Sequence, residues 1–466
     1  MSSEHYKAIV IGAGPGGYPC GIRLGQLGVK TLVVEKEFWG GVCLNVGCIP
    51  SKALITAAKR VDEIAHASTM GIEVSGDVQI NMGKLQGWKS SVVKKLTGGV
   101  KQLLQANGAD HMIGTARLAG DNEVVVTTAE GEKRYTADNI VIATGSRPIE
   151  IPGFAYADEP VLDSTKALAL EEVPQRLVVI GGGYIGLELG GMYARLGSEV
   201  TVVEMTPGLL PGFDADATKV IARSLKKAGV KTLFKTKALG WSATDDGIAV
   251  KVEGPKGEDT IPADKVLVTV GRFPNSEDLG LDAAGVELDG RFIKTDNQRR
   301  TNKPHIFAVG DVTCQPMLAH KATYEGELVA EIIAGHNRVY DARTVPAVVF
   351  TEPEIAVAGL DEAAAREQYE VKVGKVPYAA VGRALTTGES DGFFKVIVKA
   401  DDHTILGITI CGSHASDLIS EAALAIEMHA EALDVGLTIH PHPTLGEGVM
   451  EAAKAAIGEA IHIVNR

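Results

Sequence analysis

Short apolar runs separated by an amphipathic stretch open the chain. Residues 7–11 form an apolar run, a glycine-rich sequence and a helical pattern follow to about Gly28, and a second apolar run ends at Glu35. Short apolar runs joined by a helical stretch are typical of a βαβ unit in a parallel sheet. The beginning of the chain therefore predicts one such unit.

The same order returns from residue 176. An apolar run reaches Ile180, the sequence GGGYIG follows, a helical pattern extends to about Gly197, and another apolar run ends at Glu204. The interval from the first glycine of the turn to the terminal glutamate is 23 residues in both places. We therefore predict two βαβ units of the same design in one chain.

Further elements are predicted outside these two units. Helical patterns cover residues 51–67 and 85–107, and a hairpin-like region covers residues 123–142. Residues 247–252 and 265–270 have the alternating or apolar pattern of strands. These elements extend the two units without changing their order.

The pattern changes from about Arg343. Short β-like runs (AVVF, FFKVIV and ILGITI) occur with alanine-rich helical stretches over residues 416–432 and 449–460. The strands and helices here do not alternate as in a βαβ unit, so we expect a separate α+β domain.

Composition limits the class of protein. The 466 residues are 45% hydrophobic and 23% charged, which is ordinary for a globular protein and excludes a disordered or collagen-like chain. The 54 glycines exceed the average share of about 7%, so we expect many tight turns and close backbone approaches. Five cysteines are too few for a disulfide scaffold.

The formal charge of −13 argues against nucleic acid or an anionic membrane as the main partner and leaves room for a basic partner. We find no apolar run near the ~18 residues that a membrane span requires. The chain enters a predicted strand within a few residues, so we expect no targeting segment and a cytoplasmic protein.

The first glycine-rich turn has the pattern of a dinucleotide site. Gly12, Gly14 and Gly17 form GxGxxG, which permits a tight turn, close approach of the backbone to a pyrophosphate, and close packing of helix on strand. Free N–H groups at the start of the helix bind phosphate, and Glu35 can accept hydrogen bonds from ribose hydroxyls. The alternative interpretation is a purely structural turn.

The second turn repeats this chemistry. Gly181, Gly183 and Gly186 have the same spacing, and Glu204 is the terminal acid. A carboxylate at this position favours a free ribose 2′-hydroxyl and repels a 2′-phosphate. Since no Arg or Lys occurs from 205 to 210, the second site predicts NAD rather than NADP.

Cys43 and Cys48 suggest redox chemistry close to the first turn. Their spacing does not fit zinc, and no second cysteine pair supplies further ligands. Five residues of regular helix advance about 7.5 Å, whereas a disulfide requires Cα atoms within about 7 Å. The pair can therefore form a disulfide only where the helix is distorted, as Gly47 and Pro50 would permit. The alternative is two unrelated buried thiols.

With these features in order, the chain resembles the flavin-dependent pyridine nucleotide–disulfide oxidoreductases along essentially its full length. The sequences CLNVGCIPSK and HPTLGE are the most specific, because the glycine motifs alone occur in many families. The matching sequences in chain order are GAGPGG, CLNVGCIPSK, ATGSRP, GGGYIGLE, VGRFPN, AVGDV, LAHKA and HPTLGE.

The resemblance implies that the first unit binds FAD and the second binds NAD. It implies that Asp311 hydrogen-bonds the ribityl chain, and that Lys52 and Glu188 form an ion pair beside the flavin. A cation there would favour a nearby thiolate. The other cofactor contacts implied by the matching sequences are Thr144, Gly145, Gly271 and Gly310.

The resemblance also implies an acid–base pair formed by His442 and Glu447, because an imidazole needs a carboxylate to hold its orientation. From the residues alone His440 is a rival base. In the family this histidine serves the active site of the other subunit, so a homodimer is implied.

The activity implied is oxidation of dihydrolipoamide with reduction of NAD⁺, through a Cys43–Cys48 disulfide. The implied partner is a lipoyl domain of an acyltransferase (E2) or the carrier protein of the glycine cleavage system. Three alternatives are a glutathione-like disulfide reductase, a mercuric-type reductase and a non-catalytic flavin redox sensor. The acid at 204, the tail without a cysteine pair and the histidine–glutamate pair respectively argue against them.

The expected fold class is α/β, with two Rossmann-like dinucleotide-binding domains and a C-terminal α+β dimerisation domain. The expected divisions are residues 1–148 for the first part of the FAD domain, 149–275 for the NAD domain, 276–342 for the second part of the FAD domain, and 343–466 for the dimerisation domain.

Overall fold

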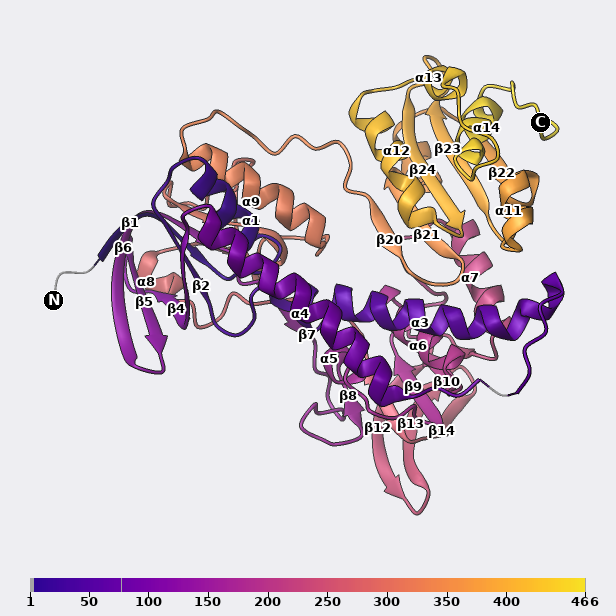
Figure 1. The fold of residues 1–466 in the computed structure, drawn as a ribbon, viewed down its shortest axis with the longest axis horizontal. Coiled ribbons are helices and arrows are strands. Elements are labelled where there is room, and N and C mark those ends of the chain that lie inside the picture. The colour runs from indigo at the N-terminus through magenta and orange to yellow at the C-terminus, as the bar shows by residue number, and fades with distance from the viewer. Residues whose placement is uncertain (1–3, 77, 466) are drawn as a thin grey trace.

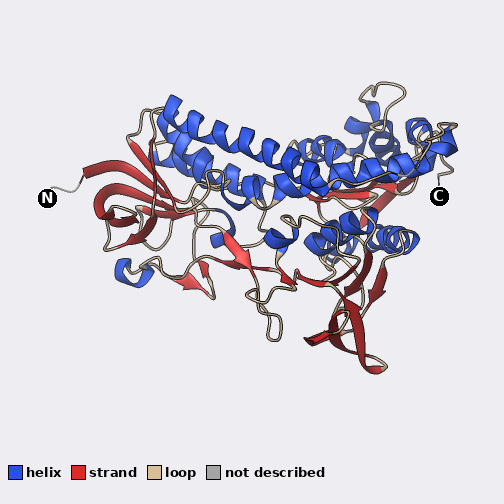
Figure 2. Ribbon diagram, turned by 60° about the horizontal axis from the view of Figure 1, so that its bottom comes forward, coloured by secondary structure: helices blue, strands red, loops and turns tan. Residues whose placement is uncertain are grey.

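A computed structural model of the protein describes residues 4–76 and 78–465. It has three parts: a sheet with long helices at the left of Figure 1, a second sheet at the lower right, and the C-terminal domain at the upper right. In Figure 2 the long helices run along the upper side, and strands occupy the left end and the lower right.

The first sheet has the strand order β3-β2-β1-β6-β5-β4, with β19 also pairing with β6. Parallel pairing joins β3, β2, β1, β6 and β19, while β4 and β5 are antiparallel. The strands are β1 (Glu4–Ile11), β2 (Thr31–Glu35), β3 (Asp110–Ile113), β4 (Thr115–Leu118), β5 (Glu123–Thr128), β6 (Gly131–Ile142) and β19 (Ile306–Ala308).

Alternate residues of these strands face two different cores. Val10 packs with Leu24, Leu104 and Leu328 from the helices α1 (Gly17–Gln26), α4 (Met82–Ala106) and α9 (Ala319–Ile333). Ile9 lies in a core with side chains of β4 and the 281–293 region. Both faces are therefore covered, as the continuous apolar run of β1 requires.

The second sheet is parallel throughout, in the order β11-β10-β9-β15-β8. A smaller antiparallel sheet, β12-β13-β14, adjoins it. The strands are β8 (Val161–Leu162), β9 (Arg176–Ile180), β10 (Glu199–Val203), β11 (Lys231–Leu233), β12 (Lys237–Thr244), β13 (Gly247–Gly254), β14 (Gly257–Ala263) and β15 (Lys265–Val268). The helices are α5 (Ser164–Ala167), α6 (Tyr184–Arg195) and α7 (Ala215–Lys227).

The C-terminal domain is built on an antiparallel sheet in the order β20-β21-β24-β23-β22, which confirms the α+β prediction. Its strands are β20 (Ala347–Val349), β21 (Glu354–Gly359), β22 (Val371–Pro377), β23 (Phe393–Lys399) and β24 (Ile405–Gly412). Its helices are α10 (Glu362–Gln368), α11 (Gly382–Thr387), α12 (Ala415–Glu427), α13 (Ala432–Leu437) and α14 (Glu447–Ala456).

One predicted helix is divided in two. The helix expected over 416–432 ends at Glu427, and His429 has a positive φ of 54° that a helix does not accommodate. A new helix begins at Ala432 behind a capping box in which the Glu431 and Asp434 side chains satisfy backbone N–H groups. The alanine-rich pattern did not reveal this interruption.

The chain passes between the first and second sheets along two short antiparallel strands, β7 (Ser146–Pro148) and β16 (Arg272–Pro274). The predicted divisions at 148, 275 and 342 fall between the sheets and stay predictions. The remaining small elements are η1 (Ala67–Met70), α8 (Leu281–Ala284), β17 (Leu288–Asp289), β18 (Phe292–Ile293), η2 (Gly310–Val312) and η3 (Tyr378–Ala380).

The stretch Gly41–Met70 holds α2 (Gly41–Asn45) and α3 (Cys48–His66), and it is long and apolar enough to cross a membrane by length and composition. This corrects the expectation that no such stretch exists. In the fold, α3 lies between the second sheet and the C-terminal domain (Figure 1) and packs against α6 and α4. Its apolar side chains, including Leu54 and Ala58, belong to a protein core.

Candidate active site

The first glycine turn has the geometry of a dinucleotide cradle. Gly12 has a φ of +101°, and a Cβ there would lie 2.4 Å from the Ala143 carbonyl oxygen. A Cβ at Gly17 would lie 1.8 Å from the Gly12 oxygen, so the start of α1 packs directly on the turn. Beside Gly14 the nearest described atom would be 3.9 Å away. The backbone at Gly14 is thus approachable by a pyrophosphate.

Glu35 ends β2 next to this cradle and is buried. Its Oε2 accepts a hydrogen bond of 2.7 Å from Ala13 N, and its Oε1 accepts one of 2.9 Å from Glu37 N. A carboxylate has about four acceptor positions, so capacity remains for a ribose hydroxyl. The donors and the acid of the first turn therefore fit a dinucleotide.

The second turn repeats the geometry. Gly181 has a φ of +109°, and a Cβ at Gly186 would lie 2.2 Å from the Gly181 oxygen. Among the described residues, no atom would lie within 4 Å of a Cβ at Gly183. Glu204 Oε2 accepts a hydrogen bond of 2.6 Å from Gly182 N. The open space beside Gly183 therefore leaves room for a dinucleotide at this turn as well.

The two cysteines lie on either side of a helix break. Cys43 is in the short α2, and Cys48 is the first residue of α3. Between them Gly47 has φ −134° and ψ −111°, which is not helical. A Cβ at Gly47 would lie 3.0 Å from the Val42 oxygen. The segment is therefore not regular helix, which is the condition that a disulfide between the cysteines requires.

In the dithiol form, Cys43 and Cys48 would differ in acidity. The pKa of Cys48 is lowered to about 7, mainly by a side-chain hydrogen bond with Cys43. The positive charge of Lys52 lowers it further. The same hydrogen bond raises the pKa of Cys43. The N-terminus of α3 also favours an anion at its first residue. Of the two sulfurs, Cys48 is therefore the one at which a thiolate is favoured.

Lys52 and Glu188 are brought together from different parts of the chain. Lys52 Nζ lies 2.7 Å from Glu188 Oε2, and the Glu188 side chain is only 5% exposed. Glu188 Oε1 accepts a hydrogen bond of 2.9 Å from Phe350 N, and Lys52 Nζ lies 4.5 Å from the centre of the Phe350 ring. The pair thus links α3, α6 and the C-terminal domain one turn away from Cys48.

Asp311 lies in η2 at the end of the first sheet. Ser146 Oγ donates a hydrogen bond of 2.6 Å to Asp311 Oδ2, and Arg272 Nε donates one of 2.8 Å to Ser146 Oγ. Gly310 N donates to the fully buried Glu325, at 2.7 Å. Sequence reasoning did not assign Ser146, Arg272 or Glu325, although each lies in or beside a motif that it used.

Thr144, Gly145 and Gly271 lie where the chain crosses between the two sheets. Thr144 Oγ1 donates a hydrogen bond of 2.7 Å to Asn275 O, and Gly145 O accepts one of 2.9 Å from Asn275 N. Gly271 has a φ of +121° and accepts from Ile149 N. These contacts are internal to the crossing, so a contact with a cofactor stays a prediction for all three.

His442 and Glu447 form a pair at the start of α14. His442 Nδ1 lies 2.9 Å from Glu447 Oε1, while Glu447 Oε2 accepts a hydrogen bond from Thr444 N. Partial burial raises the pKa of Glu447, but the hydrogen bonds from Thr444 N and His442 outweigh it and lower the pKa. The His442 ring is 77% exposed, so its second nitrogen is free to meet a substrate.

The rival base His440 is placed differently. Its Nε2 lies 2.8 Å from Glu421 Oε1 and its Nδ1 lies 2.8 Å from Thr438 O, with 7% of the side chain exposed. Both ring nitrogens are therefore occupied by protein groups. This geometry supports a structural role for His440 and leaves His442 as the candidate base.

The histidine pair and the cysteine pair lie apart in one chain. In Figure 1 the loop between α13 and α14 is at the upper end of the C-terminal domain, away from the start of α3 at the centre. Within the described part of the chain, no hydrogen bond or ion pair joins His442 to either cysteine. A single chain thus does not complete the site that the sequence predicts.

Comparison with known protein families matches two models. Residues 6–326 match the pyridine nucleotide-disulphide oxidoreductase family, and residues 345–453 match the pyridine nucleotide-disulphide oxidoreductase dimerisation domain. Together the two matches include both glycine turns, the cysteine pair and the histidine–glutamate pair.

Curated relatives are similar over almost the whole chain. The dihydrolipoyl dehydrogenase of Bacillus subtilis (strain 168) is 51% identical over 98% of this chain and 97% of its own length. Those of Geobacillus stearothermophilus and Thermus scotoductus (strain ATCC 700910 / SA-01) are each 49% identical, covering 99% of this chain and 98% and 99% of their own lengths.

Solved structures have the same fold. LpdA from Mycobacterium tuberculosis superposes with a TM-score of 0.90 at 27% identity, over 96% of this chain and 99% of that one. The HOCl-induced flavoprotein disulfide reductase RclA from Escherichia coli gives a TM-score of 0.86 at 25% identity, over 96% of this chain and 99% of that one.

Proposed function

This chain belongs to the pyridine nucleotide-disulphide oxidoreductase family, and on that premise we propose that it oxidises dihydrolipoamide to lipoamide while reducing NAD⁺ to NADH. The observation that carries the proposal is the Cys43–Cys48 pair at a helix break, in a chain about half identical to dihydrolipoyl dehydrogenases over nearly its full length. The catalytic residues are Cys43, Cys48, His442 and Glu447.

The cofactors are FAD and NAD. Gly12, Gly14, Gly17 and Glu35 hold FAD in the first cradle, with Asp311 held by Ser146 at the sheet end. Gly181, Gly183, Gly186 and Glu204 hold NAD in the second. Bound FAD supplies an acceptor for the electron pair of the cysteine dithiol and a hydride donor for NAD⁺.

The sulfur chemistry uses the chain's own residues. His442 removes a proton from one substrate thiol, and the resulting thiolate attacks the Cys43 sulfur. The Cys43–Cys48 bond breaks, and Cys48 leaves as a thiolate, in keeping with its lowered pKa. The second substrate sulfur, deprotonated in turn, displaces Cys43 and closes the lipoyl disulfide.

The step balances in protons and electrons. The substrate loses two protons and two electrons, the enzyme disulfide becomes the Cys43 thiol and the Cys48 thiolate, and one proton goes to solvent through His442. Glu447 holds the imidazole in orientation and stabilises its cation. Lys52 favours the Cys48 thiolate.

The protein is a homodimer, in keeping with the dimerisation domain over residues 345–453. We propose that the site is completed across the two subunits. The separation of the two pairs in one chain supports this, because His442 is exposed and the cysteines lie elsewhere. The partner subunit's His442 would then serve the cysteines of this chain.

The physiological substrate that we propose is dihydrolipoamide on a lipoyl domain of an E2 acyltransferase or on the glycine cleavage carrier protein. The formal charge of −13 is compatible with docking to a basic peripheral domain. The place of this reaction would be the cytoplasm.

One comparison of substrates tests the activity. The flavin-loaded dimer should reduce lipoamide with NADH at least about 10²-fold faster than it reduces glutathione disulfide with NADPH, because Glu204 disfavours a 2′-phosphate. Equal or higher activity with glutathione disulfide would instead identify another flavin disulfide reductase.

His442→Gln provides the residue-level test. It should lose about 10²–10⁴-fold in turnover while keeping its FAD. The matched control is His440→Gln, which alters a structural histidine of the same loop and should lose much less activity.

A further inference from the structure

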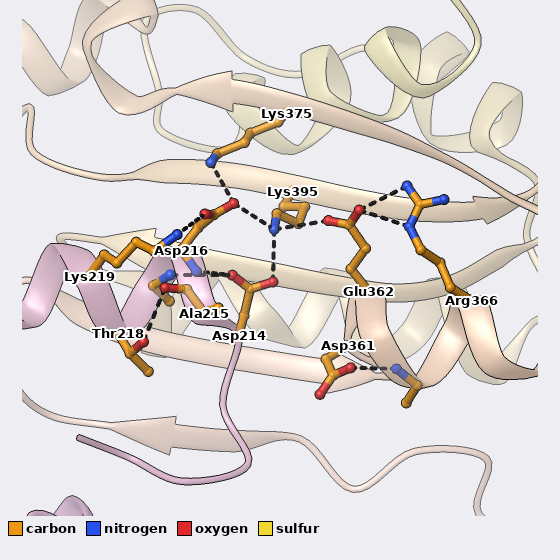
Figure 3. Close-up of polar contacts among 12 residues, drawn as sticks. Asp214, Ala215, Asp216, Thr218, Lys219, Asp361, Glu362, Arg366, Lys375 and Lys395 are labelled. Atoms are coloured by element: carbon orange, nitrogen blue, oxygen red, sulfur yellow. Dashed lines mark hydrogen bonds and ion pairs between the residues drawn. The ribbon is translucent and has the colours of Figure 1, made fainter. Parts of the chain in front are cut away.

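Charged side chains gather at the contact between the second unit and the C-terminal domain, and Figure 3 shows them around Lys395. Lys395 projects from β23 and is only 4% exposed. Its Nζ lies 2.8 Å from Asp214 Oδ2, 2.9 Å from Asp216 Oδ2 and 3.3 Å from Glu362 Oε2. We call these residues, with the outer cations Lys219, Lys375 and Arg366, the seam cluster.

Asp214 has two tasks in this cluster. Its Oδ1 accepts hydrogen bonds from Asp216 N and Ala217 N and so caps the N-terminus of α7. Its Oδ2 binds Lys395 from the other domain. The side chain is 3% exposed, and a buried carboxylate without a partner is costly. The cap of α7 is therefore tied to the C-terminal domain.

Lys395 and Asp216 are both stabilised in their ionised forms. Burial lowers the pKa of Lys395, but its hydrogen bonds to Asp214 and Asp216 outweigh this and raise it. A hydrogen bond from Lys375, followed by one from Lys395, lowers the pKa of Asp216. Both partners thus stay charged at neutral pH.

Asp214 is the far end of the loop that begins at Glu204, the acid of the second cradle. Thr206 N donates to Glu204 Oε1 at 2.6 Å, and Leu210 N donates to Gly182 O at 2.9 Å. A Cβ on Gly182 would lie 2.9 Å from Leu209 Cδ2 and 3.1 Å from Glu204 Oε2. The loop therefore lies directly against the nucleotide cradle.

The loop also holds one residue in an unfavourable backbone conformation. Leu210 has a φ of +50°, and a positive φ is unfavourable for a residue with a side chain. A cavity of about 100 Å³ lies between residues 212–214 and strands β21 and β24. The ion pairs of Asp214 join the end of the loop to β23 beside this cavity.

We propose that Lys395 is a positioning residue for the NAD site: by holding Asp214 from the C-terminal domain, it fixes the loop 205–214 and with it Glu204 and Gly182. The inference rests on the proposed function, because it assigns NAD to the second cradle. Lys395 itself lies in another domain and acts only through the loop.

The test uses flavin-loaded dimers of full-length variants. Lys395→Met removes the cation but leaves buried carboxylates unpaired, so we expect this single variant to lose stability. The double variant Lys395→Met/Asp214→Asn avoids that charge, and asparagine keeps the helix cap. Apolar contacts across the same seam, including Leu210, Ile355 and Phe393 in one core, should keep the domains together. Lys399→Met is the matched control, since Lys399 is on the same strand and pairs with Asp402.

Two direct measurements test whether Lys395 positions the NAD site. Equilibrium titration with NAD⁺ and with NADH should show affinity at least about fivefold weaker in the double variant than in the wild type. Hydrogen exchange of the backbone amides of the loop 205–214 should become faster. The Lys399→Met control should match the wild type in both.

Steady-state kinetics should likewise show an effect on NAD⁺ and not on the other substrate or on FAD. The KM for NAD⁺ should rise, while FAD content, the KM for dihydrolipoamide and kcat at saturating NAD⁺ stay within about twofold. A double variant that is folded and flavin-loaded but binds NAD⁺ and NADH like the wild type would overturn the inference. So would a loss of thermal stability with unchanged nucleotide affinity. Failure of the proposed function would differ, because the wild type itself would then not couple dihydrolipoamide to NAD⁺.

Discussion

The two dinucleotide units share the same glycine spacing but differ in what covers them. In the first unit a Cβ on Gly41 would lie 2.6 Å from Gly14 Cα, and a Cβ on Gly326 would lie 2.2 Å from Gly16 O. Segments from α2 and α9 therefore pack tightly against the first turn, although a Cβ on Gly14 itself would meet no described atom nearer than 3.9 Å. In the second unit Gly183 has open space among the described residues.

This difference indicates how one motif can serve two kinds of ligand. A turn enclosed by other segments suits a cofactor that stays bound, since release would require those segments to separate. An open turn bordered by a loop suits a coenzyme that enters and leaves in each catalytic cycle. Coverage, rather than the glycines, distinguishes the two units.

The largest effect is expected when the cysteine chemistry beside the first unit is removed. Cys48→Ser removes the sulfur that becomes the thiolate, and lipoamide turnover should fall by at least about 10³-fold. Both nucleotide cradles are untouched, so FAD content and NAD⁺ affinity should be unchanged. Rapid turnover by a pure, sequence-verified variant would contradict the sulfur scheme.

Matched glycine substitutions test the two turns directly. Gly17→Ala and Gly186→Ala each place a methyl within about 2.2 Å of a backbone oxygen, and such overpacking costs about 1–3 kcal/mol. We expect Gly17→Ala to lose bound FAD and Gly186→Ala to keep FAD but bind NADH more weakly. Absorbance of the bound flavin and NADH titration measure the two effects.

The control is Gly99→Ala in α4. No described atom would lie within 4 Å of its Cβ, so this change should be neutral or slightly stabilising. If Gly186→Ala released FAD as readily as Gly17→Ala, the distinction between the units would be lost.

The charge of the cysteine pair gives a smaller, pH-dependent effect. The pKa of Cys48 is lowered to about 7, below the ordinary value of about 8.5 for a free thiol. Lys52→Met should raise it, and alkylation of the reduced protein at pH 7 should become a few-fold slower. Alkylation rates between pH 5 and 10 give the midpoint.

The sign for stability follows from the lowered pKa. The stabilising contribution of the thiolate is complete above about pH 8.5, where the unfolded thiol is also ionised, and is lost as the pH falls through 7. Between about pH 7 and 8.5, unfolding of the reduced protein by denaturant should show this slope in the wild type and a shallower one in Lys52→Met, because the raised pKa of Cys43 acts in the opposite direction only at higher pH. If the midpoint of the alkylation rates were the same in Lys52→Met as in the wild type, Lys52 would not be a cause of the lowered pKa of Cys48.

The smallest expected effect compares the two ribose acids. Glu204→Gln should weaken NADH binding by about fivefold, because a neutral hydrogen bond from the ribose to the amide oxygen replaces a charged one, a difference of about 1 kcal/mol. Glu35→Gln should leave FAD content unchanged at ordinary concentrations, because the first cradle is enclosed by other segments. Loss of FAD from Glu35→Gln with intact NADH binding in Glu204→Gln would reverse the comparison.

Local pattern predicted much of the fold. The strands Thr31–Glu35 and Arg176–Ile180 lie where the apolar runs placed them, because a buried parallel strand is a short apolar run. The strands β12 and β14 were not predicted, since many of their residues are exposed and polar. The break at His429 was missed because a positive φ at a histidine has no sequence signature of its own.

The residues of the candidate site also divide into those that local motifs predicted and those whose contacts only the fold reveals. The glycine turns and the cysteine pair are local motifs, and together with their flanking sequences they indicated dinucleotide binding and redox chemistry, with structural alternatives left open. The partners that hold Asp311 and Asp214 are distant: Ser146 is 165 residues from Asp311, and Lys395 is 181 residues from Asp214. Contacts over such separations depend on how whole domains pack, which one sequence does not reveal.

The antiparallel pairing of β7 with β16 has a consequence for the relative motion of the domains. Because the chain enters and leaves the second unit through two strands bonded to each other, these strands form one narrow hinge. The Lys395 contact is a second attachment, in another domain. The Lys52–Glu188 pair and the apolar core shared with α3 and the C-terminal domain also hold the second unit, so a rotation of this unit about the two strands would require all of these contacts to break together.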